Sequence, residues 1–172
     1  MPPLRVVLGP GAFGSPADLA PFLRGLRARG VAADAVALPR GRAERAAPVF
    51  AALAGPDVVA GGHSFGGRAA SLAAAGGARF AGLLLFGFPL AGQAVRRTEH
   101  LARVGCPVLV LNGDADRLSP AADLCCALAP LPHVRLVILH GARHRLAGAP
   151  LERALDLAAE FVDGLAAGAS HD

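Results

Sequence analysis

The sequence contains no lysine, tryptophan or tyrosine, so all 17 of its basic residues are arginine. Nucleic-acid-binding modules usually carry a basic stripe with interleaved aromatic side chains. Here the arginines are scattered, and their abundance beside alanine and glycine is typical of a GC-rich genome. The missing lysine also excludes a phosphate-binding loop that ends in Gly-Lys-Ser/Thr. We therefore expect no nucleic-acid partner, although the formal net charge is +4.

Long apolar runs and paired cysteines are lacking as well. The longest apolar stretch, around residues 80–90, contains two glycines and a proline and is too short to span a membrane. The segment Met1–Arg5 does not resemble a secretory signal. Cys106, Cys125 and Cys126 have neither the spacing of zinc ligands nor an even count. These absences predict a cytoplasmic protein with no membrane partner and no metal, whose cysteines are small buried residues.

Strand-like and helix-like segments alternate along the whole chain. Most of the strand-like runs are apolar throughout, as expected for strands buried on both faces. The alternation predicts one three-layer α/β/α domain over residues 1–172, with a parallel six-stranded sheet and a frayed tail from about residue 165. Ser15 and Ser119, each followed by proline, are expected to cap helices. The predicted strands are residues 4–8, 31–38, 57–61, 82–86, 107–111 and 135–139, and the predicted helices are residues 16–29, 44–54, 65–75, 91–104, 120–128 and 151–167.

The most informative segment is residues 58–70. An apolar run leads into Gly-His-Ser-Phe-Gly at residues 62–66, and an alanine-rich run follows. This is the pattern of a nucleophile elbow, in which a sharp strand-to-helix turn exposes a serine hydroxyl. Gly62 and Gly66 are predicted to leave room for the neighbouring strand and helix. Ser64 is therefore the candidate nucleophile, whereas His63 is expected to be a packed or surface histidine.

A serine nucleophile needs a base and an orienting acid, and candidates for both follow later predicted strands. Ligands of an open parallel sheet bind beyond the carboxyl ends of its strands. His144 lies in the loop after the last predicted strand, so we prefer it as the base over His140, which we place at the strand end. We prefer Asp116 as the acid over Asp114, because an aspartate in a Gly-Asp turn is suited to an Asx turn.

An oxyanion hole requires two N–H donors that point to the developing negative charge. One is expected from the backbone of Phe65, at the start of the helix after Ser64, where N–H groups are free. The other is expected from the glycine-rich loop at residues 9–14, with Ala12 as first choice and Phe13 as second. The alternative interpretations of this loop are a plain tight turn or a phosphate cradle. We expect it to bind neither a nucleotide nor a dinucleotide, so no cofactor is predicted.

Five linked motifs extend the pattern over almost the whole chain. They are Gly-His-Ser-Phe-Gly-Gly-Arg at 62–68, Phe-Pro-Leu at 88–90, Arg-Thr-Glu-His-Leu at 97–101, Cys-Pro-Val-Leu-Val-Leu-Asn-Gly-Asp-Ala-Asp at 106–116 and Gly-Ala-Arg-His at 141–144. Together they resemble the small, lidless, dienelactone-hydrolase-like group of α/β-hydrolases. That group includes the hydrolase-like domain of the third subunit of the NSL histone-acetyltransferase complex, testis-expressed relatives and bacterial proteins. By position, the resemblance assigns Ser64, Asp116 and His144 to a catalytic triad, and it implies a bacterial source here.

The resemblance implies a serine hydrolase that acts on small esters or thioesters through an acyl-enzyme intermediate. Only about 20 residues separate the fourth and fifth predicted strands, which leaves room for one helix and no cap domain. The resulting open site has Phe13, Pro89 and Arg97 as candidate substrate contacts. For Arg97, an ion pair that holds the short helix over the site is the favoured alternative.

One departure from the group motivates a second hypothesis. The first loop of the family usually reads His-Gly-x-Gly, and here Pro10-Gly11 replaces His-Gly. A non-catalytic interaction module that retains the fold is therefore the alternative function, because a fold alone does not define an activity. A cofactor-free haloperoxidase or perhydrolase side activity would use the same triad.

Overall fold

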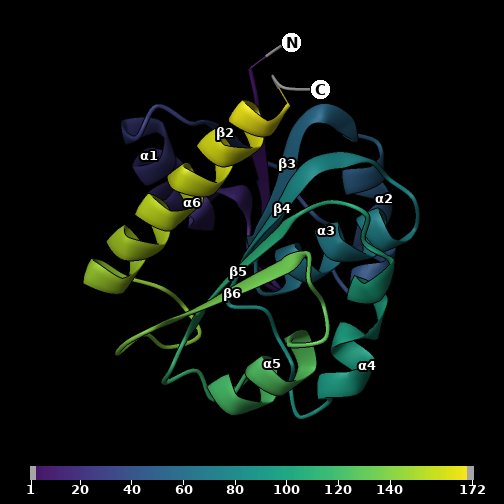
Figure 1. The fold of residues 1–172 in the computed structure, drawn as a ribbon, viewed down its shortest axis with the longest axis vertical. Coiled ribbons are helices and arrows are strands. Elements are labelled where there is room, and N and C mark those ends of the chain that lie inside the picture. The colour runs from purple at the N-terminus through teal and green to yellow at the C-terminus, as the bar shows by residue number, and fades with distance from the viewer. Residues whose placement is uncertain (1–2, 170–172) are drawn as a thin grey trace.

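Six parallel strands form the centre of the protein in the computed structural model, which describes residues 3–169 (Figure 1). The strand order is β2-β1-β3-β4-β5-β6, so the chain reverses its direction of travel across the sheet between β1 and β3. All six predicted strands are present and the predicted three-layer architecture is confirmed. The strands are β1 (Arg5–Gly9), β2 (Ala32–Ala35), β3 (Gly55–His63), β4 (Phe80–Phe86), β5 (Val108–Gly113) and β6 (Val134–Leu139).

Helices cover both faces of the sheet. One face packs against α1 (Ala20–Ala28), which follows the 3-10 turn η1 (Pro16–Leu19), and against α6 (Gly148–Gly168). These two helices lie together on one side of the ribbon (Figure 1). The opposite face is covered by α2 (Ala43–Ala51), α3 (Phe65–Ala75), α5 (Ala121–Leu128) and the 3-10 turn η2 (Glu99–Arg103), which follows the short α4 (Ala94–Thr98).

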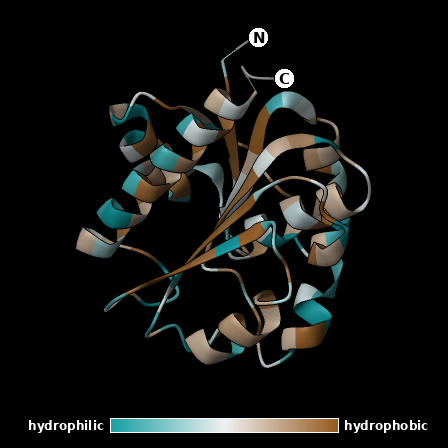
Figure 2. Cartoon of the chain, in the orientation of Figure 1, coloured by the Kyte–Doolittle hydropathy of each residue, from teal (hydrophilic) through white to brown (hydrophobic). Residues whose placement is uncertain are grey.

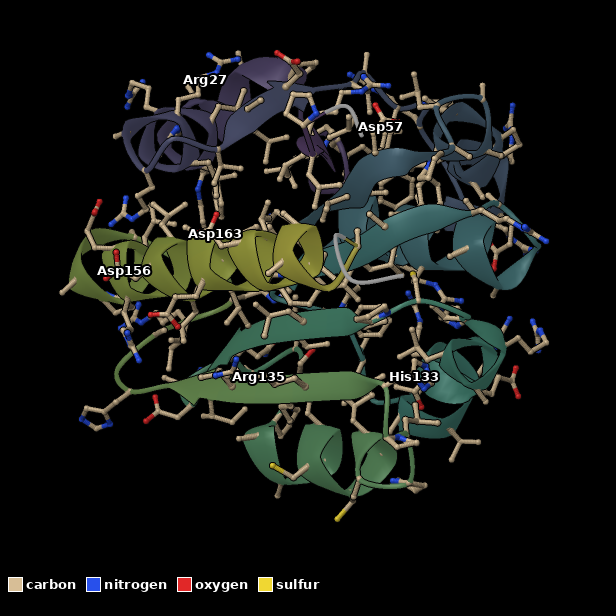
Figure 3. The ribbon with its side chains drawn as sticks, turned by 45° about the horizontal axis from the view of Figure 1, so that its top comes forward. Arg27, Asp57, His133, Arg135, Asp156 and Asp163 are labelled. Atoms are coloured by element: carbon tan, nitrogen blue, oxygen red, sulfur yellow. The ribbon has the colours of Figure 1, made fainter. Side chains whose placement is uncertain are left out.

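The apolar strands produce two cores because successive side chains point to opposite faces. In β4, Leu84 belongs to the core under α1 and α6, whereas Leu83 and Leu85 belong to the core under α2, α3 and α5. All three side chains are fully buried, and each contributes about 2 kcal/mol to folding. Figure 2 shows the same arrangement, with hydrophobic colour concentrated in the strands. Charged side chains such as Arg135, Asp156 and Asp163 lie on the exposed surface (Figure 3).

One edge strand of the sheet and the end of the chain differ from expectation. The edge strand β2 stops at Ala35, three residues early, because it pairs only with β1 and its last contact is the Val36 N–H on the Leu8 carbonyl. Residues 165–168 belong to α6 and are not frayed, because Leu165 packs on the sheet beside Gly82. The last residues of the predicted tail, 170–172, lie outside the described residues.

The predictions for Ser119 and for two of the three cysteines were wrong. Ser119 does not cap α5; its hydroxyl instead bonds the backbone of the loop after β4, as described below. Cys125 and Cys126 are exposed on α5, because the buried positions of that helix are taken by Leu124 and Leu128. Cys106 is partly buried, and this burial raises the pKa of its thiol to about 11.

The connection between β4 and β5 contains only α4 and η2, so no cap domain covers the carboxyl ends of the strands. No helix within residues 3–169 combines the length and the apolar character needed to cross a bilayer.

Candidate active site

Ser64 occupies a strained turn between β3 and α3. Its backbone has φ 50° and ψ −112°, a region that is sparsely populated for residues other than glycine. The turn persists because the Ser64 N–H donates to the Phe86 carbonyl at 2.9 Å and the Ser64 carbonyl accepts the first bond of α3. A Cβ at Gly62 or Gly66 would collide with the carbonyl oxygen of Gly9 in β1. The predicted steric role of these two glycines is confirmed, and β1 is the neighbour that requires it.

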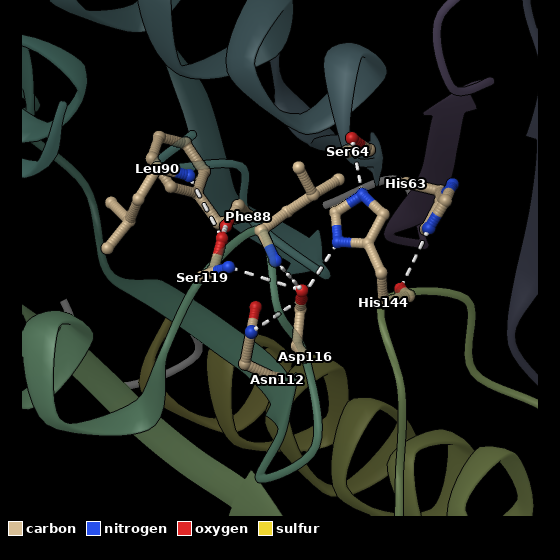
Figure 4. A network of polar contacts seen from close by, with 9 residues as sticks. His63, Ser64, Phe88, Leu90, Asn112, Asp116, Ser119 and His144 are labelled. Carbon is tan, nitrogen blue, oxygen red and sulfur yellow. Dashed lines mark hydrogen bonds and ion pairs between the residues drawn. The ribbon is translucent and has the colours of Figure 1, made fainter. Parts of the chain in front are cut away.

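A chain of hydrogen bonds joins Ser64, His144 and Asp116 (Figure 4). His144 Nε2 lies 2.8 Å from Ser64 Oγ, and His144 Nδ1 lies 2.8 Å from Asp116 Oδ2. A neutral imidazole that donates from Nδ1 to the carboxylate has its Nε2 lone pair free to accept the serine proton. This geometry is the one that a general base and its orienting acid require.

Asp116 is held rigidly in the protein interior. Its side chain is 0% exposed, and Oδ2 also accepts from Asn112 Nδ2 at 3.0 Å. Oδ1 accepts from the backbone N–H groups of Leu118 at 2.9 Å and Ser119 at 3.2 Å. Four N–H donors therefore satisfy the carboxylate and fix its orientation toward His144.

Ser119 connects the Asp116 loop to the loop after β4. Its hydroxyl donates to the Phe88 carbonyl at 2.5 Å and accepts from the Leu90 N–H at 2.9 Å. Pro89 lies between these two anchors and lines the cleft at Ser64. Sequence reasoning missed this role because Ser-Pro before a helix is also a common capping pattern.

The competing candidates form a second pair that does not reach Ser64. His140 Nδ1 lies 2.9 Å from Asp114 Oδ2, and the His140 side chain is completely exposed. Asp114 also accepts from the Gly141 N–H at 2.8 Å. The expected Asx turn at Asp114 is therefore wrong, since this carboxylate bonds across to the loop after β6. It is Asp116 that bonds backbone groups just beyond it.

His63 has a contact that the sequence did not predict. Its Nε2 lies 3.0 Å from the backbone carbonyl of His144, and the two rings are 5.2 Å apart. Because a carbonyl can only accept, Nε2 of His63 must carry the proton. Burial lowers the pKa of His63, partly offset by this hydrogen bond. The only signal in the sequence was its place next to the candidate nucleophile.

The two candidate oxyanion donors lie beside Ser64. Phe65 is the first residue of α3, and Ala12 lies in the loop after β1. Within residues 3–169, neither backbone N–H has a hydrogen-bond acceptor. Both residues line the cleft that contains Ser64. Phe13, the second choice, has φ 62° and is 83% exposed.

Two clefts meet at Ser64. The first has a volume of about 420 Å³ and includes Phe65, Pro89 and Arg97; the second has a volume of about 400 Å³ and includes Phe13 and His144. The three predicted contact residues thus all line a cleft that also contains Ser64. No ion pair of Arg97 exists within the described residues, so the favoured alternative for Arg97 is not found.

The glycine spacing of the loop after β1 raises the question of whether this loop could bind a dinucleotide. Gly9, Gly11 and Gly14 stand at the Gly-x-Gly-x-x-Gly spacing of dinucleotide-binding folds, so the spacing itself does not exclude a dinucleotide. In those folds, a free helix N-terminus binds the pyrophosphate. Here Asp18 of η1 turns back and accepts from the Ser15 N–H at 2.7 Å. The loop therefore presents a carboxylate where a pyrophosphate would need free N–H groups, and it does not fit such a cofactor.

The fold and this arrangement are those of an α/β-hydrolase, and the family comparison agrees. Residues 40–161 match the model of an alpha/beta hydrolase domain family, which covers more than half of the chain. The protein belongs to that family. The narrower resemblance to the dienelactone-hydrolase-like group remains a prediction. No curated protein matches the sequence.

Several solved structures share the fold. Esterase 2 of Thermogutta terrifontis, phosphonylated by cyclosarin, has a TM-score of 0.76 at 18% identity over 95% of this chain and 83% of that chain. A monoacylglycerol lipase from Paleococcus ferrophilus has a TM-score of 0.78 at 15% identity over 95% of this chain and 96% of that one. Est1E from Butyrivibrio proteoclasticus has a TM-score of 0.75 at 18% identity, with coverages of 96% and 89%. At these identities, the likeness shows the fold alone.

Proposed function

We propose that the protein is a serine hydrolase that cleaves small-molecule esters or thioesters through an acyl-enzyme intermediate. The observation that carries the proposal is the hydrogen-bonded chain from Ser64 through His144 to Asp116, with 2.8 Å at each step. The family, whose name denotes hydrolases, and the esterases and lipase that share the fold support the same activity class.

The reaction follows from the geometry. Ser64 Oγ attacks the carbonyl carbon while His144 Nε2 takes the serine proton, and the carbonyl oxygen becomes an oxyanion. The N–H groups of Phe65 and Ala12 would donate to that oxyanion. When the intermediate collapses, His144 gives the proton to the leaving alcohol or thiol, and Ser64 keeps the acyl group. A water molecule then repeats the sequence, with His144 as base, and releases the carboxylic acid.

The test is to compare wild type with Ser64→Ala. Wild type is expected to hydrolyse p-nitrophenyl acetate and to bind a fluorophosphonate probe covalently, and Ser64→Ala should lose both properties. Ser15→Ala, which removes a serine of the neighbouring loop, is the matched control and should retain both. Activity and labelling that persist in Ser64→Ala contradict the proposal. A folded wild type that neither turns over esters nor reacts with the probe supports the non-catalytic module instead.

A further inference from the structure

The two clefts at Ser64 differ in charge. The first is lined by four arginines and one acidic residue, namely Arg42, Arg68, Arg96, Arg97 and Glu44. The second contains one arginine and one aspartate, Arg145 and Asp18, beside the two histidines of the site. Only the first cleft therefore has a large excess of positive charge.

Most of these arginines have no acidic partner. Within residues 3–169, the side chains of Arg42 and Arg97 make no hydrogen bond and no ion pair. Arg96 bonds only the neutral Gln93, at 3.4 Å. Arg68 Nη2 lies 3.5 Å from Glu44 Oε1, and Arg68 Nη1 donates to the Arg97 backbone carbonyl at 2.9 Å. One carboxylate thus faces four guanidinium groups.

Arg68 is the most buried of the four arginines. Its side chain is 9% exposed, and burial together with the charge of Arg97 lowers its pKa. A guanidinium group in this position is stabilised by an anion, which it binds with charge-assisted and often bidentate hydrogen bonds. The cleft is therefore suited to an anionic part of a substrate.

The position of His144 indicates which part of the substrate enters each cleft. His144 must protonate the leaving oxygen, so the leaving group lies on its side, and His144 lines only the second cleft. The arginine-lined cleft does not include His144, and it contains Phe65, a candidate oxyanion donor. It is therefore placed to receive the acyl group.

From this geometry we infer that the preferred substrates are half-esters of dicarboxylic acids, in which the acyl group carries a free carboxylate that Arg97, Arg96 and Arg68 bind. The inference rests on the proposed hydrolase function and names its substrate class. The ester carbonyl lies at Ser64, the carboxylate lies in the first cleft and the alcohol lies beside His144. Hydrolysis then releases the alcohol and a dicarboxylate.

The experiment compares substrates that differ only in charge. Monoethyl glutarate carries the carboxylate in its acyl group, and ethyl glutaramate replaces that carboxylate with a neutral amide. A second pair, 4-acetoxybutanoate and 4-acetoxybutanamide, carries the same difference in the alcohol. We expect kcat/KM to favour monoethyl glutarate over its amide by about 10- to 100-fold, the range of a charged hydrogen bond. The two substrates of the second pair should have similar kcat/KM values.

Substitutions of the cleft arginines test whether they cause the preference for a free carboxylate. The ratio of kcat/KM for monoethyl glutarate to kcat/KM for ethyl glutaramate should fall toward one in Arg97→Gln and come closer to one in Arg96→Gln/Arg97→Gln. Arg97→Lys should keep part of the wild-type ratio. Arg153→Gln, on the exposed surface of α6, removes the same charge far from the cleft and should keep the wild-type ratio. Circular dichroism confirms that each variant is folded.

The outcomes separate this inference from the function on which it rests. Equal rates for the glutarate pair, a ratio that survives loss of Arg96 and Arg97, or a preference for 4-acetoxybutanoate each overturn the inference while leaving the hydrolase intact. Calorimetric titration of Ser64→Ala with monoethyl glutarate measures the carboxylate site without turnover. Binding that weakens in Ser64→Ala/Arg97→Gln supports the site even if esters prove not to be substrates, and absence of binding overturns it.

Discussion

Two histidine–aspartate pairs occupy neighbouring loops of this protein, and only one of them is joined to Ser64. The ring nitrogen and the carboxylate oxygen are 2.8 Å apart in the His144–Asp116 pair and 2.9 Å apart in the His140–Asp114 pair. The side chains of His144 and Asp116 are 23% and 0% exposed, whereas those of His140 and Asp114 are 101% and 35% exposed. Distance alone therefore does not distinguish a candidate catalytic pair from a surface ion pair.

Burial and additional contacts explain the difference. An exposed ion pair is screened by water and salt, and its side chains are free to exchange partners. Asp116 is instead held by Asn112 and by two backbone N–H groups, and His144 is held by His63. Only such a constrained pair keeps one tautomer and one ring orientation long enough to serve a nucleophile.

The largest difference between the two pairs is expected when each histidine is replaced by alanine in a separate variant. His144→Ala should lower kcat for p-nitrophenyl acetate by about 10⁴- to 10⁶-fold, because Ser64 loses its base. His140→Ala should stay near the wild-type value. Steady-state rates and fluorophosphonate labelling measure both effects. Equal losses in the two variants would show that the pairs are not functionally different.

The carboxylates give the next largest contrast. Asp116→Asn should lower kcat by about 10³- to 10⁴-fold, because an amide N–H facing Nδ1 stabilises the wrong tautomer of His144. Asp114→Asn keeps a similar shape on the exposed pair and should change kcat little. The rates are measured together with urea denaturation, which shows whether either variant is unfolded. An Asp116→Asn enzyme with a near-normal rate would mean that Asp116 does not orient the base.

Much of this comparison could be predicted from the sequence, because the relevant signals are local. Alternating apolar and helical segments predicted the six strands, and the glycines at positions 62 and 66 predicted the elbow. The preference for His144 and Asp116 over His140 and Asp114 came from their positions relative to strand ends. The structure joins the preferred residues to Ser64 by hydrogen bonds.

The remaining contacts depend on tertiary structure. Ser119 bonds the loop after β4, 29 to 31 residues away in sequence, and His63 bonds a carbonyl 81 residues away. No local pattern indicates such partners. The exposure of Cys125 and Cys126 likewise depends on which face of α5 meets the sheet, and two adjacent cysteines give no helical period to decide it.

A third histidine extends the comparison to an imidazole that has no acidic partner. His100 is buried; its Nε2 lies 2.7 Å from Ser71 Oγ, and within residues 3–169 its Nδ1 has no partner. Burial, reinforced by the charge of Arg68, lowers the pKa of His100 to about 4. Above the unfolded pKa of about 6.5, the ring is neutral in both the folded and the unfolded state, so its titration does not change the free energy of unfolding. Between pH 6.5 and about 4, only the unfolded state binds the proton, so the folded state loses stability as the pH falls.

The expected loss from this group is roughly 3 kcal/mol of unfolding free energy, or about 100-fold in the unfolding constant, once the pH is near 4. Urea denaturation at pH 7, 6, 5 and 4 measures it. His100→Gln should reduce the pH dependence; some will remain, because burial lowers the pKa of His63 in the same direction. His140→Gln, which removes an exposed histidine, is the control. Identical pH dependence in wild type and His100→Gln would contradict the prediction.

The smallest effect tests what holds His144 in place. His63→Leu removes the hydrogen bond to the His144 carbonyl, so the loop should gain some of the freedom that the exposed pair already has. A lost hydrogen bond of this kind costs about 1 kcal/mol, so kcat should fall by about 5-fold. His63→Gln can place an amide N–H near the former Nε2 and should recover much of the rate. If His63 positions the base, the Leu and Gln variants will differ in kcat more than in KM. Because His63 also lines the cleft beside His144, equal kcat values with a raised KM in His63→Leu would instead assign His63 to substrate contact.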